Sequence, residues 1–383
     1  MRKNNKLKNR FCHKPWEQAE IGAVGIGSDS GRVSMCCQCW VEKPIGSVTE
    51  DNLLDAWNSE YAQKVRQGVL DGTFSECNEK FCPHIQNGLL PERDEVLNND
   101  TFLWDGIYEM ESKHYRDIIL NNEVTHHGPE YLHLSYDESC NLSCPSCRCE
   151  KIQFTEGSEY EKRRAVQDKI MKYAFDTNNK HRIIISITGS GDPFGSKMFR
   201  EFLFAADASR NPNVFYNIQT NGVLLNRTVW DKMSKIHSRI NTLLISVDAG
   251  TKEVYDQVRR GGNWSKLNEN LLMLKELKET EQIKGFRTDM IIQQRNYKDM
   301  AKFIQLAKSV NSDSAYLAVI RPWSQSEAYK EGFHIHDVWR RDHPEHQQFL
   351  DILRDPIFDD PIVDLGNVSE YRERAYGQIS EFA

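Results

Sequence analysis

The sequence lacks any apolar stretch long enough to cross a membrane. The longest strongly apolar stretch is IIISI at 183–187, far short of the roughly 20 residues that a spanning helix needs. The basic N-terminus, MRKNNKLKNR, is not followed by an apolar segment, so it does not match a secretory signal. We therefore expect a cytoplasmic protein without a membrane partner.

An excess of positive charge is also absent. The 383 residues include 56 acidic and 49 basic ones, which gives a net charge of −7. No basic domain stands out, so nucleic acid is not an expected partner. Hydrophobic residues make up 39% and charged residues 27% of the chain, as in ordinary globular proteins, and the length favours two structural units.

Cysteine is absent after residue 149, although the chain contains ten. Six lie before residue 83 and four lie between 140 and 149. Without a secretory signal, clustered cysteines indicate metal binding or catalysis rather than disulfides. The two groups predict two separate metal sites and an approximate domain map.

Short β-branched runs alternate with longer helical patterns from about residue 130 onward. The expected strands cover 131–136, 182–188, 214–220, 242–248, 286–293 and 314–320. This alternation predicts right-handed β-α-β units in an α/β fold, arranged as a partial, open (β/α)6 barrel similar to a TIM barrel. Reactive groups in such folds gather in loops beyond the carboxyl ends of the strands.

The regions on either side of the expected barrel, 130–322, are different in character. Residues 1–90 are rich in loops and cysteine, with one clear helix near 50–70, and a metal would stabilise such a segment. Residues 91–129 are interpreted as a connecting segment, and 323–383 as an extension that packs on the barrel. The aromatic and histidine side chains of this extension could line a substrate-binding site, or they could pack in the protein interior, and both interpretations stay open. These side chains are Trp323, Tyr329, His334, His336 and Trp339.

Three of the cysteines form a tight loop directly after the first expected strand. The stretch SYDESCNLSCPSCR spaces Cys140, Cys144 and Cys147 as Cys-x3-Cys-x2-Cys. Thiolates ligate iron–sulfur clusters, and three of them leave one iron of a [4Fe–4S] cluster open to a substrate or cofactor. The alternative is a zinc loop, although structural zinc requires four ligands. Cys149 is interpreted as a bystander thiol.

This loop, at the head of six β/α repeats, resembles the signature of the radical S-adenosylmethionine (SAM) superfamily. The resemblance implies an enzyme whose [4Fe–4S] cluster binds SAM at the open iron. One-electron reduction then yields a 5′-deoxyadenosyl radical that abstracts hydrogen from a substrate. An electron donor of the flavodoxin or ferredoxin type is implied as well. Family members commonly carry an aromatic or bulky residue before the third cysteine, where this chain has Ser146.

The loops after later strands match SAM-binding positions of the family. The turn TGSGDP (188–193) resembles the glycine-rich turn that receives the methionyl amine of SAM. Ser246 would face the ribose or carboxylate, and Arg259 would pair with the carboxylate. A surface charge remains the alternative for Arg259, with Arg260 as its rival. The implied SAM contacts are Gly189, Ser190, Gly191, Asp192, Ser246, Arg259, Asn221 and Gln293. No catalytic side chain is assigned.

The N-terminal cysteine motifs FCHKPW, GRVSMCC and CNEKFC resemble a SPASM or twitch module, the auxiliary cluster-binding element of many radical SAM maturases. The familiar module follows the barrel, whereas this one precedes it. Cys37 could replace Cys36 as a ligand, and Cys39 is a weaker candidate for the same position. The alternative to an iron–sulfur site is a zinc ribbon with four cysteine ligands. The resemblance implies a second [4Fe–4S] cluster with four ligands, namely Cys12, Cys36, Cys77 and Cys82.

Similar enzymes with auxiliary clusters modify peptides and proteins. The resemblance therefore implies a peptide or protein substrate and a maturase-like oxidation or cross-linking reaction. A sugar or small metabolite is the alternative substrate. An alternative of another class is a non-catalytic iron–sulfur or zinc protein that carries electrons or serves as a scaffold.

Overall fold

The computed structural model divides the chain into two compact units. The first comprises Met1–Tyr136 and Glu156–Ser186, and the second comprises Asp137–Thr155 and Ile187–Ala383. Within them the structure describes residues 5–22, 29–37, 40–41, 43–104, 108–187, 190–321, 330 and 332–377. None of the helices in these ranges has the length and apolar character needed to span a membrane.

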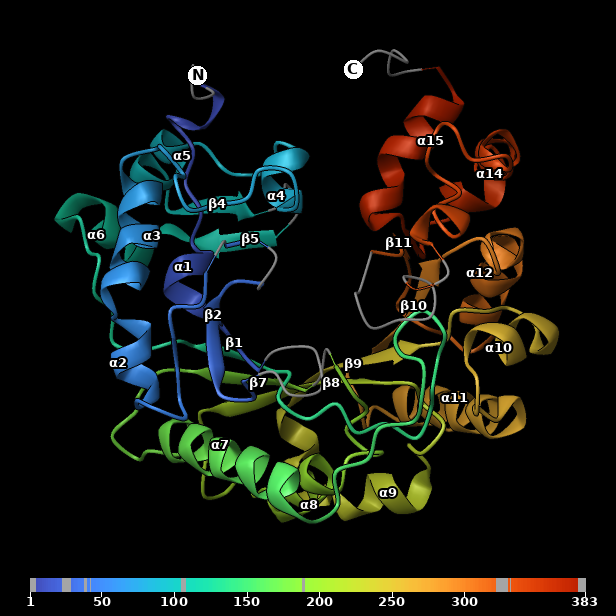
Figure 1. The fold of residues 1–383 in the computed structure, drawn as a ribbon, viewed down its shortest axis with the longest axis horizontal. Coiled ribbons are helices and arrows are strands. Elements are labelled where there is room, and N and C mark those ends of the chain that lie inside the picture. The colour runs from blue at the N-terminus through green and yellow to red at the C-terminus, as the bar shows by residue number, and fades with distance from the viewer. Residues whose placement is uncertain are drawn as a thin grey trace. The chain divides into compact units, whose positions relative to one another are not determined.

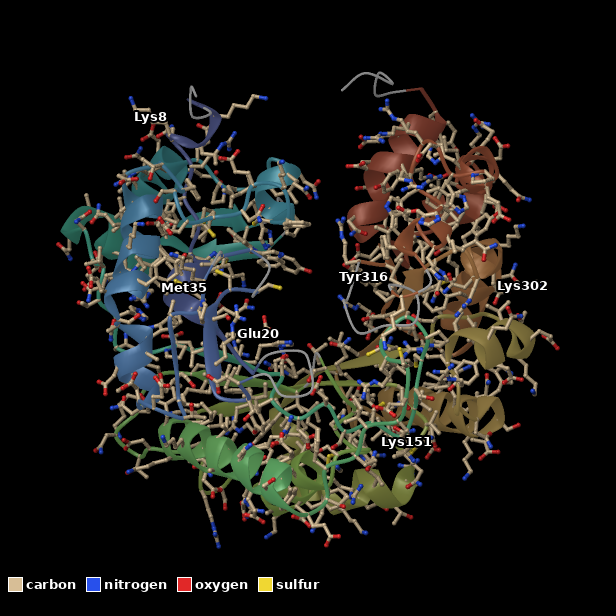
Figure 2. All side chains as sticks on the ribbon, viewed as in Figure 1. Lys8, Glu20, Met35, Lys151, Lys302 and Tyr316 are labelled. Carbon is tan, nitrogen blue, oxygen red and sulfur yellow. The ribbon has the colours of Figure 1, made fainter. Side chains whose placement is uncertain are left out.

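The sheet of the first unit joins the cysteine-rich N-terminus to the first two expected barrel strands. Its strands follow the order β7-β6-β1-β2-β3. The hairpin of β1 and β2 is antiparallel, and β1 runs parallel to β6, with Ala19 opposite Leu132. Met35, which Figure 2 labels on β2, is fully buried. The bounds are β1 Gln18–Ile21, β2 Arg32–Met35, β3 Gly46–Ser47, β6 Tyr131–Leu134 and β7 Ile183–Ile187.

Helices and a separate hairpin complete the first unit (Figure 1). Arg66 is fully buried and donates hydrogen bonds to the carbonyl oxygens of Pro15, Trp57 and Val124, so it ties three segments together. The elements are η1 Asn5–Leu7, α1 Lys14–Glu17, α2 Leu53–Trp57, α3 Glu60–Leu70, α4 Pro83–Gln86, α5 Arg93–Asn98, β4 Thr101–Trp104, β5 Tyr108–Glu111, α6 Ser112–Asn121 and α7 Ser158–Ala174.

The segment 91–129, interpreted above as a connection, contributes to the core of the first unit. It contains α5, the β4–β5 hairpin and α6. Phe102 and Ile118 from this segment share one buried cluster with Phe11, Trp16 and Val69 from the N-terminal region. Its apolar residues are too sparse for this role to be evident from periodicity alone.

The second unit consists of parallel strands alternating with helices. The strand order is β12-β11-β10-β9-β8, and the strands of each adjacent pair run parallel. Leu243, Met290 and Leu317 are fully buried on three neighbouring strands, as expected for a parallel sheet covered on both faces. The strand bounds are β8 Val214–Thr220, β9 Ile240–Ser246, β10 Phe286–Ile292, β11 Ser314–Val319 and β12 Val363–Asp364.

The helices of this unit follow the strands as the β-α-β pattern requires. They are α8 Lys197–Ala205, α9 Arg227–Lys232, η2 Ser234–Arg239, α10 Lys252–Val258, α11 Trp264–Glu279, η3 Tyr297–Asp299 and α12 Met300–Ser309. The predicted α/β class with an open (β/α) arrangement is thus confirmed, and in neither unit do the described strands close into a complete barrel.

The C-terminal extension adds a short strand, β12, which the sequence did not suggest, and several small helices. His336 and Trp339 are buried, whereas His334 is exposed. Trp323 and Tyr329 lie outside the described residues. The helical elements are η4 Phe333–Ile335, α14 His346–Ile352, η5 Pro356–Asp359, η6 Gly366–Val368 and α15 Ser369–Ala375.

Candidate metal centres

The three-cysteine loop belongs entirely to the second unit. Cys140 and Cys144 are 8% and 6% exposed, whereas Cys147 is exposed. Burial raises the pKa of Cys140 to about 12 and also raises that of Cys144. Burial thus opposes ionisation of both thiols, and metal binding would favour loss of their protons.

Each of the three thiols has an N–H donor nearby. The backbone N–H of Leu142 lies 3.3 Å from Cys140 Sγ. The Arg148 Nη2 atom lies 3.4 Å from Cys147 Sγ, and the Arg259 Nη1 atom lies 3.8 Å from Cys144 Sγ. Hydrogen bonds and positive charge stabilise thiolates, so the surroundings of the loop suit thiolate ligands rather than inert thiols.

The glycine-rich turn packs directly against the start of this loop. A Cβ atom added to Gly191 would lie 2.6 Å from the carbonyl oxygens of both Asp137 and Ser139. The Asp192 N–H donates to the Ser139 carbonyl oxygen at 2.9 Å. Only glycine allows this close approach of two backbones. Gly189, a further predicted SAM contact, lies outside the described residues.

The buried carboxylate of Asp192 is fully used within the protein. It accepts hydrogen bonds from the backbone N–H groups of Phe194, Gly195 and Asn221, and from Thr220 Oγ1, at 2.8–3.0 Å. Burial raises its pKa while these bonds oppose the change. Asp192 thus joins the loop after β7 to the end of β8, and the structure shows a positioning arrangement where the sequence suggested an acceptor for an ammonium group.

Asn221 reaches the cysteine loop from the end of β8. Its Nδ2 atom donates to Asn141 Oδ1 at 2.9 Å and lies 3.8 Å from Cys140 Sγ. Ser190 is brought to the same loop, because its carbonyl oxygen and that of Glu138 both accept from the buried Arg148 guanidinium. Sequence reasoning missed Asn141 and Arg148, although both adjoin cysteines of the motif.

Arg259 and Arg260 have different surroundings. Arg259 Nη2 forms an ion pair with Asp248 Oδ2 at 3.0 Å, and both side chains are largely buried. Arg260 instead donates to Ser143 Oγ and to the Cys149 carbonyl oxygen. Arg259 is therefore the arginine beside a motif thiol, and the surface-charge interpretation does not describe it. Its partner Asp248 was not predicted.

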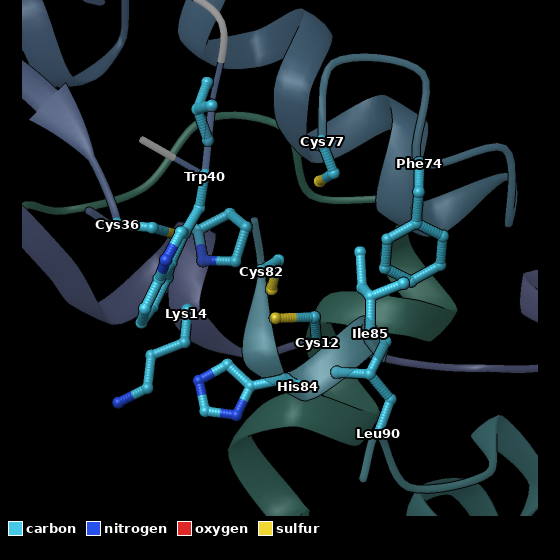
Figure 3. A pocket seen from close by; sticks show the side chains of 12 residues that line it. Cys12, Lys14, Cys36, Trp40, Phe74, Cys77, Cys82, His84, Ile85 and Leu90 are labelled. Carbon is cyan, nitrogen blue, oxygen red and sulfur yellow. The ribbon is translucent and has the colours of Figure 1, made fainter. Parts of the chain in front are cut away.

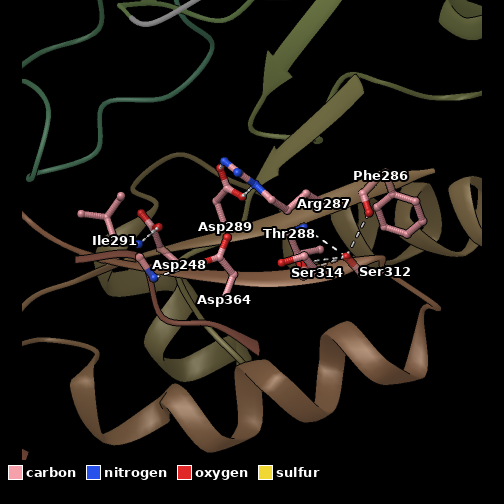
Figure 4. A network of polar contacts seen from close by, with 10 residues as sticks. Asp248, Phe286, Arg287, Thr288, Asp289, Ile291, Ser312, Ser314 and Asp364 are labelled. Atoms are coloured by element: carbon pink, nitrogen blue, oxygen red, sulfur yellow. Dashed lines mark hydrogen bonds and ion pairs between the residues drawn. The ribbon is translucent and has the colours of Figure 1, made fainter. Parts of the chain in front are cut away.

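Asp248 itself is held in an unusual backbone conformation, with φ of +63°. Its Oδ1 atom accepts from the Ile291 N–H at 2.7 Å (Figure 4). Its carbonyl oxygen accepts from Asn296 Nδ2 at 2.9 Å. Ser246, half-buried near the end of β9, lies opposite Asp289 in the β9–β10 register. Asp289 in turn pairs with Arg287 at 2.7 Å.

Gln293 is fully buried just after β10. Neither its Oε1 nor its Nε2 atom has a hydrogen-bond partner in the part of the chain that the structure describes. A buried amide without partners is costly and rare in native proteins. Such a group fits a pocket in which a polar ligand completes the hydrogen bonding.

The second cysteine group converges in the first unit. Cys12, Cys36, Cys77 and Cys82 line one pocket, and their sulfur atoms face a common space (Figure 3). Burial raises the pKa of Cys12 and Cys36, as well as that of Cys77 to about 12, and the neighbouring thiols raise them further. Four convergent thiols form a closed ligand set, which suits a [4Fe–4S] cluster or zinc.

The positions of the competing cysteines differ from that of Cys36. Cys36 follows β2 directly, has a φ of +60°, and lines the pocket. Cys37 is not among the residues that line it, and Cys39 lies outside the described residues.

Lys14 also borders the pocket and pairs with Glu17 at 3.1 Å. A cation beside the thiols favours their ionised, metal-binding form.

Comparison with known proteins agrees with this geometry. Residues 136–307 match the model of the radical SAM superfamily, and residues 12–83 match that of the SPASM iron–sulfur cluster-binding domain. The chain is 32% identical over 117 residues to a cysteine-type anaerobic sulfatase-maturating enzyme of Clostridium novyi. This match covers 29% of the chain and only 30% of the relative's length.

Solved structures show weaker likeness. The crystal structure of Streptococcus suis SuiB bound to S-adenosylmethionine is 15% identical, with a TM-score of 0.43, over 71% of this chain and 58% of that one. Native anSMEcpe with bound AdoMet is 16% identical, with a TM-score of 0.41, over 60% and 59% of the two chains. The two matched models and the two thiol groups lead to one conclusion: residues 136–307 are similar to the radical SAM superfamily, and residues 12–83, ahead of them in the chain, are similar to the SPASM iron–sulfur cluster-binding domain.

Proposed function

We propose that the chain is a maturase that uses SAM to oxidise or cross-link a peptide or protein. In this proposal the SPASM-like module spans residues 1–90 and the radical SAM barrel spans 130–322. When bound, a [4Fe–4S] cluster with SAM would supply the radical chemistry for hydrogen abstraction from the substrate. Cys140, Cys144 and Cys147 would hold this cluster.

One observation carries the proposal: three thiols of a single loop each have an N–H donor, two of which belong to arginine side chains. Three thiolates and a cluster concentrate negative charge in a buried place. Arg148 and Arg259 offset that charge where it arises. The residues present therefore fit a cluster with three protein ligands.

The residues around the loop position it and include polar groups suited to a polar cofactor. Asp192 and Asn221 bind the loops after β7 and β8 to each other, and Gly191 lets the first of these approach the cysteine loop. The Gln293 amide, which has no partner within the described part of the chain, supplies both a donor and an acceptor. We assign Gln293 and Ser246 to direct contacts with SAM, whereas Gly191, Asp192 and Asn221 position the loops around it.

The second thiol group would hold an auxiliary cluster through Cys12, Cys36, Cys77 and Cys82. All four ligand positions are then provided by the protein, so this cluster is suited to electron transfer rather than to binding SAM. Oxidation of a substrate by hydrogen abstraction leaves an electron to be removed. An electron acceptor in the same chain supports an oxidative maturation reaction, and a flavodoxin or ferredoxin would supply electrons to the first cluster.

The substrate assignment draws on the Clostridium novyi relative, whose name identifies a sulfatase as its target. We extend this to a peptide or protein substrate for the present chain. The aligned 117 residues, at 32% identity, support a similar class of reaction.

The test is SAM cleavage by the reconstituted protein. The chain is loaded with iron and sulfide under anaerobic conditions, reduced with dithionite, and supplied with SAM; 5′-deoxyadenosine is then measured by chromatography and mass spectrometry. Alanine at Cys140, Cys144 or Cys147 should abolish the product. Cys149→Ala is the matched control and should retain it. Bound iron without any cleavage in the wild type would contradict the proposal.

Substrate turnover separates the two clusters. The Cys77→Ala and Cys82→Ala variants should still cleave SAM, but they should not convert a candidate peptide to product. Retained conversion by both variants would contradict the role that we propose for the second cluster.

A further inference from the structure

A third cluster of metal-ligating side chains lies in the first unit, apart from both cysteine groups. His127, Glu130 and His181 each offer one ligand atom, and these atoms all lie within 4.8 Å of one another. Among the described residues, no other three histidine, cysteine, aspartate or glutamate side chains bring their ligand atoms this close together. The function proposed above makes no use of it.

The three side chains already contact one another. His127 Nε2 lies 3.1 Å from Glu130 Oε1, and His181 Nδ1 lies 3.9 Å from the same oxygen. The His127 and His181 rings stack with centroids 3.6 Å apart and an angle of 19° between their planes. One carboxylate oxygen thus faces nitrogen atoms from two imidazoles.

The backbone beneath the cluster is well anchored. Glu130 directly precedes β6, and its N–H and carbonyl oxygen bond to Glu17 and Ile184 at 2.9 and 2.7 Å. His181 precedes β7 by one residue, Arg182. The ligands therefore occupy the amino ends of two strands, whereas the three-cysteine loop follows the carboxyl end of β6 in the sequence.

A neighbouring histidine limits the freedom of His127. The His126 ring lies 3.8 Å from that of His127, and its Nδ1 atom is 3.0 Å from the Gly128 carbonyl oxygen. If Nδ1 of His126 carries the proton and donates it to this carbonyl, the lone pair of the ring is on Nε2, on the other side. The buried Nε2 atom of His126 has no partner among the described residues. The side chains of His127, Glu130 and His181 are 30%, 37% and 42% exposed, so an ion and water can reach them.

We propose that His127, Glu130 and His181 bind a divalent ion of the zinc class, with water completing the coordination. Two imidazoles and a carboxylate match zinc, whereas magnesium and calcium prefer oxygen ligands alone. Zinc–ligand distances near 2.0–2.1 Å place tetrahedral ligand atoms about 3.4 Å apart. The observed group needs only a small closure to reach that spacing. The ion would link the segments that precede β6 and β7.

The test is a calorimetric titration of Zn²⁺ into the cluster-loaded protein, whose cysteine sites are already occupied. We expect one zinc per chain for the wild type. His127→Gln, Glu130→Gln and His181→Gln should each weaken binding at least tenfold. His334→Gln, at an exposed histidine elsewhere, is the matched control and should bind as the wild type does.

Three outcomes would overturn the assignment. The first is that the wild type does not bind zinc. The second is that all three site variants bind zinc with the affinity of the wild type. The third is that the wild type binds Mg²⁺ as tightly as Zn²⁺. The three side chains are partly exposed, so the variants should fold, and circular dichroism with iron content checks this. If one histidine variant fails that check, Glu130→Gln answers the same question, because its backbone bonds do not involve the side chain.

Discussion

The guanidinium of Arg259 is held by Asp248, whose Oδ2 atom lies 3.0 Å from Arg259 Nη2. The same guanidinium reaches Cys144 Sγ through Nη1. Burial opposes a charge on Arg259, but Asp248 and Cys144 outweigh it and raise the arginine pKa. A permanent positive charge thus stands beside one ligand of the proposed SAM-binding cluster.

Replacing Arg259 should make that cluster harder to reduce. Arg259→Gln removes a positive charge next to the reduced, more negative state, and we expect the midpoint potential to fall by about 59 mV or more, a tenfold change for a one-electron couple. Redox titration of the electron paramagnetic resonance signal that changes on SAM addition measures this. Arg260→Gln is the control, since Arg260 contacts Ser143 and a carbonyl oxygen. Equal shifts in both variants would refute the specific role of Arg259.

Gly191→Ala should remove the first cluster and spare the second. The added Cβ atom would lie 2.6 Å from two carbonyl oxygens of the loop that begins the cysteine motif, so the loop must move. We expect iron to fall from about eight to about four per chain. Gly157→Ala is the control, because its Cβ atom meets nothing within 4 Å and only its positive φ is strained. Full iron content in Gly191→Ala would show that the loop tolerates displacement.

Cys36 and Cys37 should respond oppositely to substitution. Cys36 lines the four-thiol pocket and Cys37 does not, so Cys36→Ser should lower iron and sulfide to about four of each per chain while Cys37→Ser keeps about eight. Chemical analysis of both after anaerobic reconstitution decides between them. The opposite pattern would assign the ligand to Cys37, and about four iron atoms in the wild type would favour zinc at this site.

Gln293→Leu should stabilise the protein and weaken SAM binding. The buried amide has no partner among the described residues, and removing an unsatisfied polar group of this kind returns about 1–3 kcal/mol of folding free energy. Urea unfolding without SAM and equilibrium binding of SAM measure the two effects.

The neighbouring Gln294 supplies the control for this prediction. Its Nε2 atom bonds to Glu345, so Gln294→Leu should lose a little stability and leave SAM affinity unchanged. A Gln293→Leu variant that is both less stable and normal in SAM binding would mean that the amide packs with partners of its own.

Much of the fold and the positions of the ligands follow from local patterns. β8 begins and ends as the alternation of VFYNIQT predicts, and the short Cys-x3-Cys-x2-Cys spacing identifies the first loop without any tertiary information. Partners distant in sequence could not be predicted this way. Asp248 meets Arg259 because its backbone turns to a positive φ after β9, and no pattern in a single sequence specifies that turn.

The same limit applies to the N-terminal region. Its resemblance to a SPASM module predicts the four thiols, but not the pairing of β1 with β6, which depends on two segments more than a hundred residues apart. The role of residues 91–129 in the core was hidden for the same reason, since Phe102 and Ile118 contact residues near the N-terminus only after folding.

The parallel pairing of β1 with β6 makes the N-terminal hairpin part of the main sheet of the first unit rather than a detachable appendage. A chain cut after residue 90 would lose β1, β2 and β3 and leave β6 with a bare row of backbone donors and acceptors. Such an edge invites pairing with other chains. A fragment that begins at residue 91 is therefore expected to aggregate when it is produced alone.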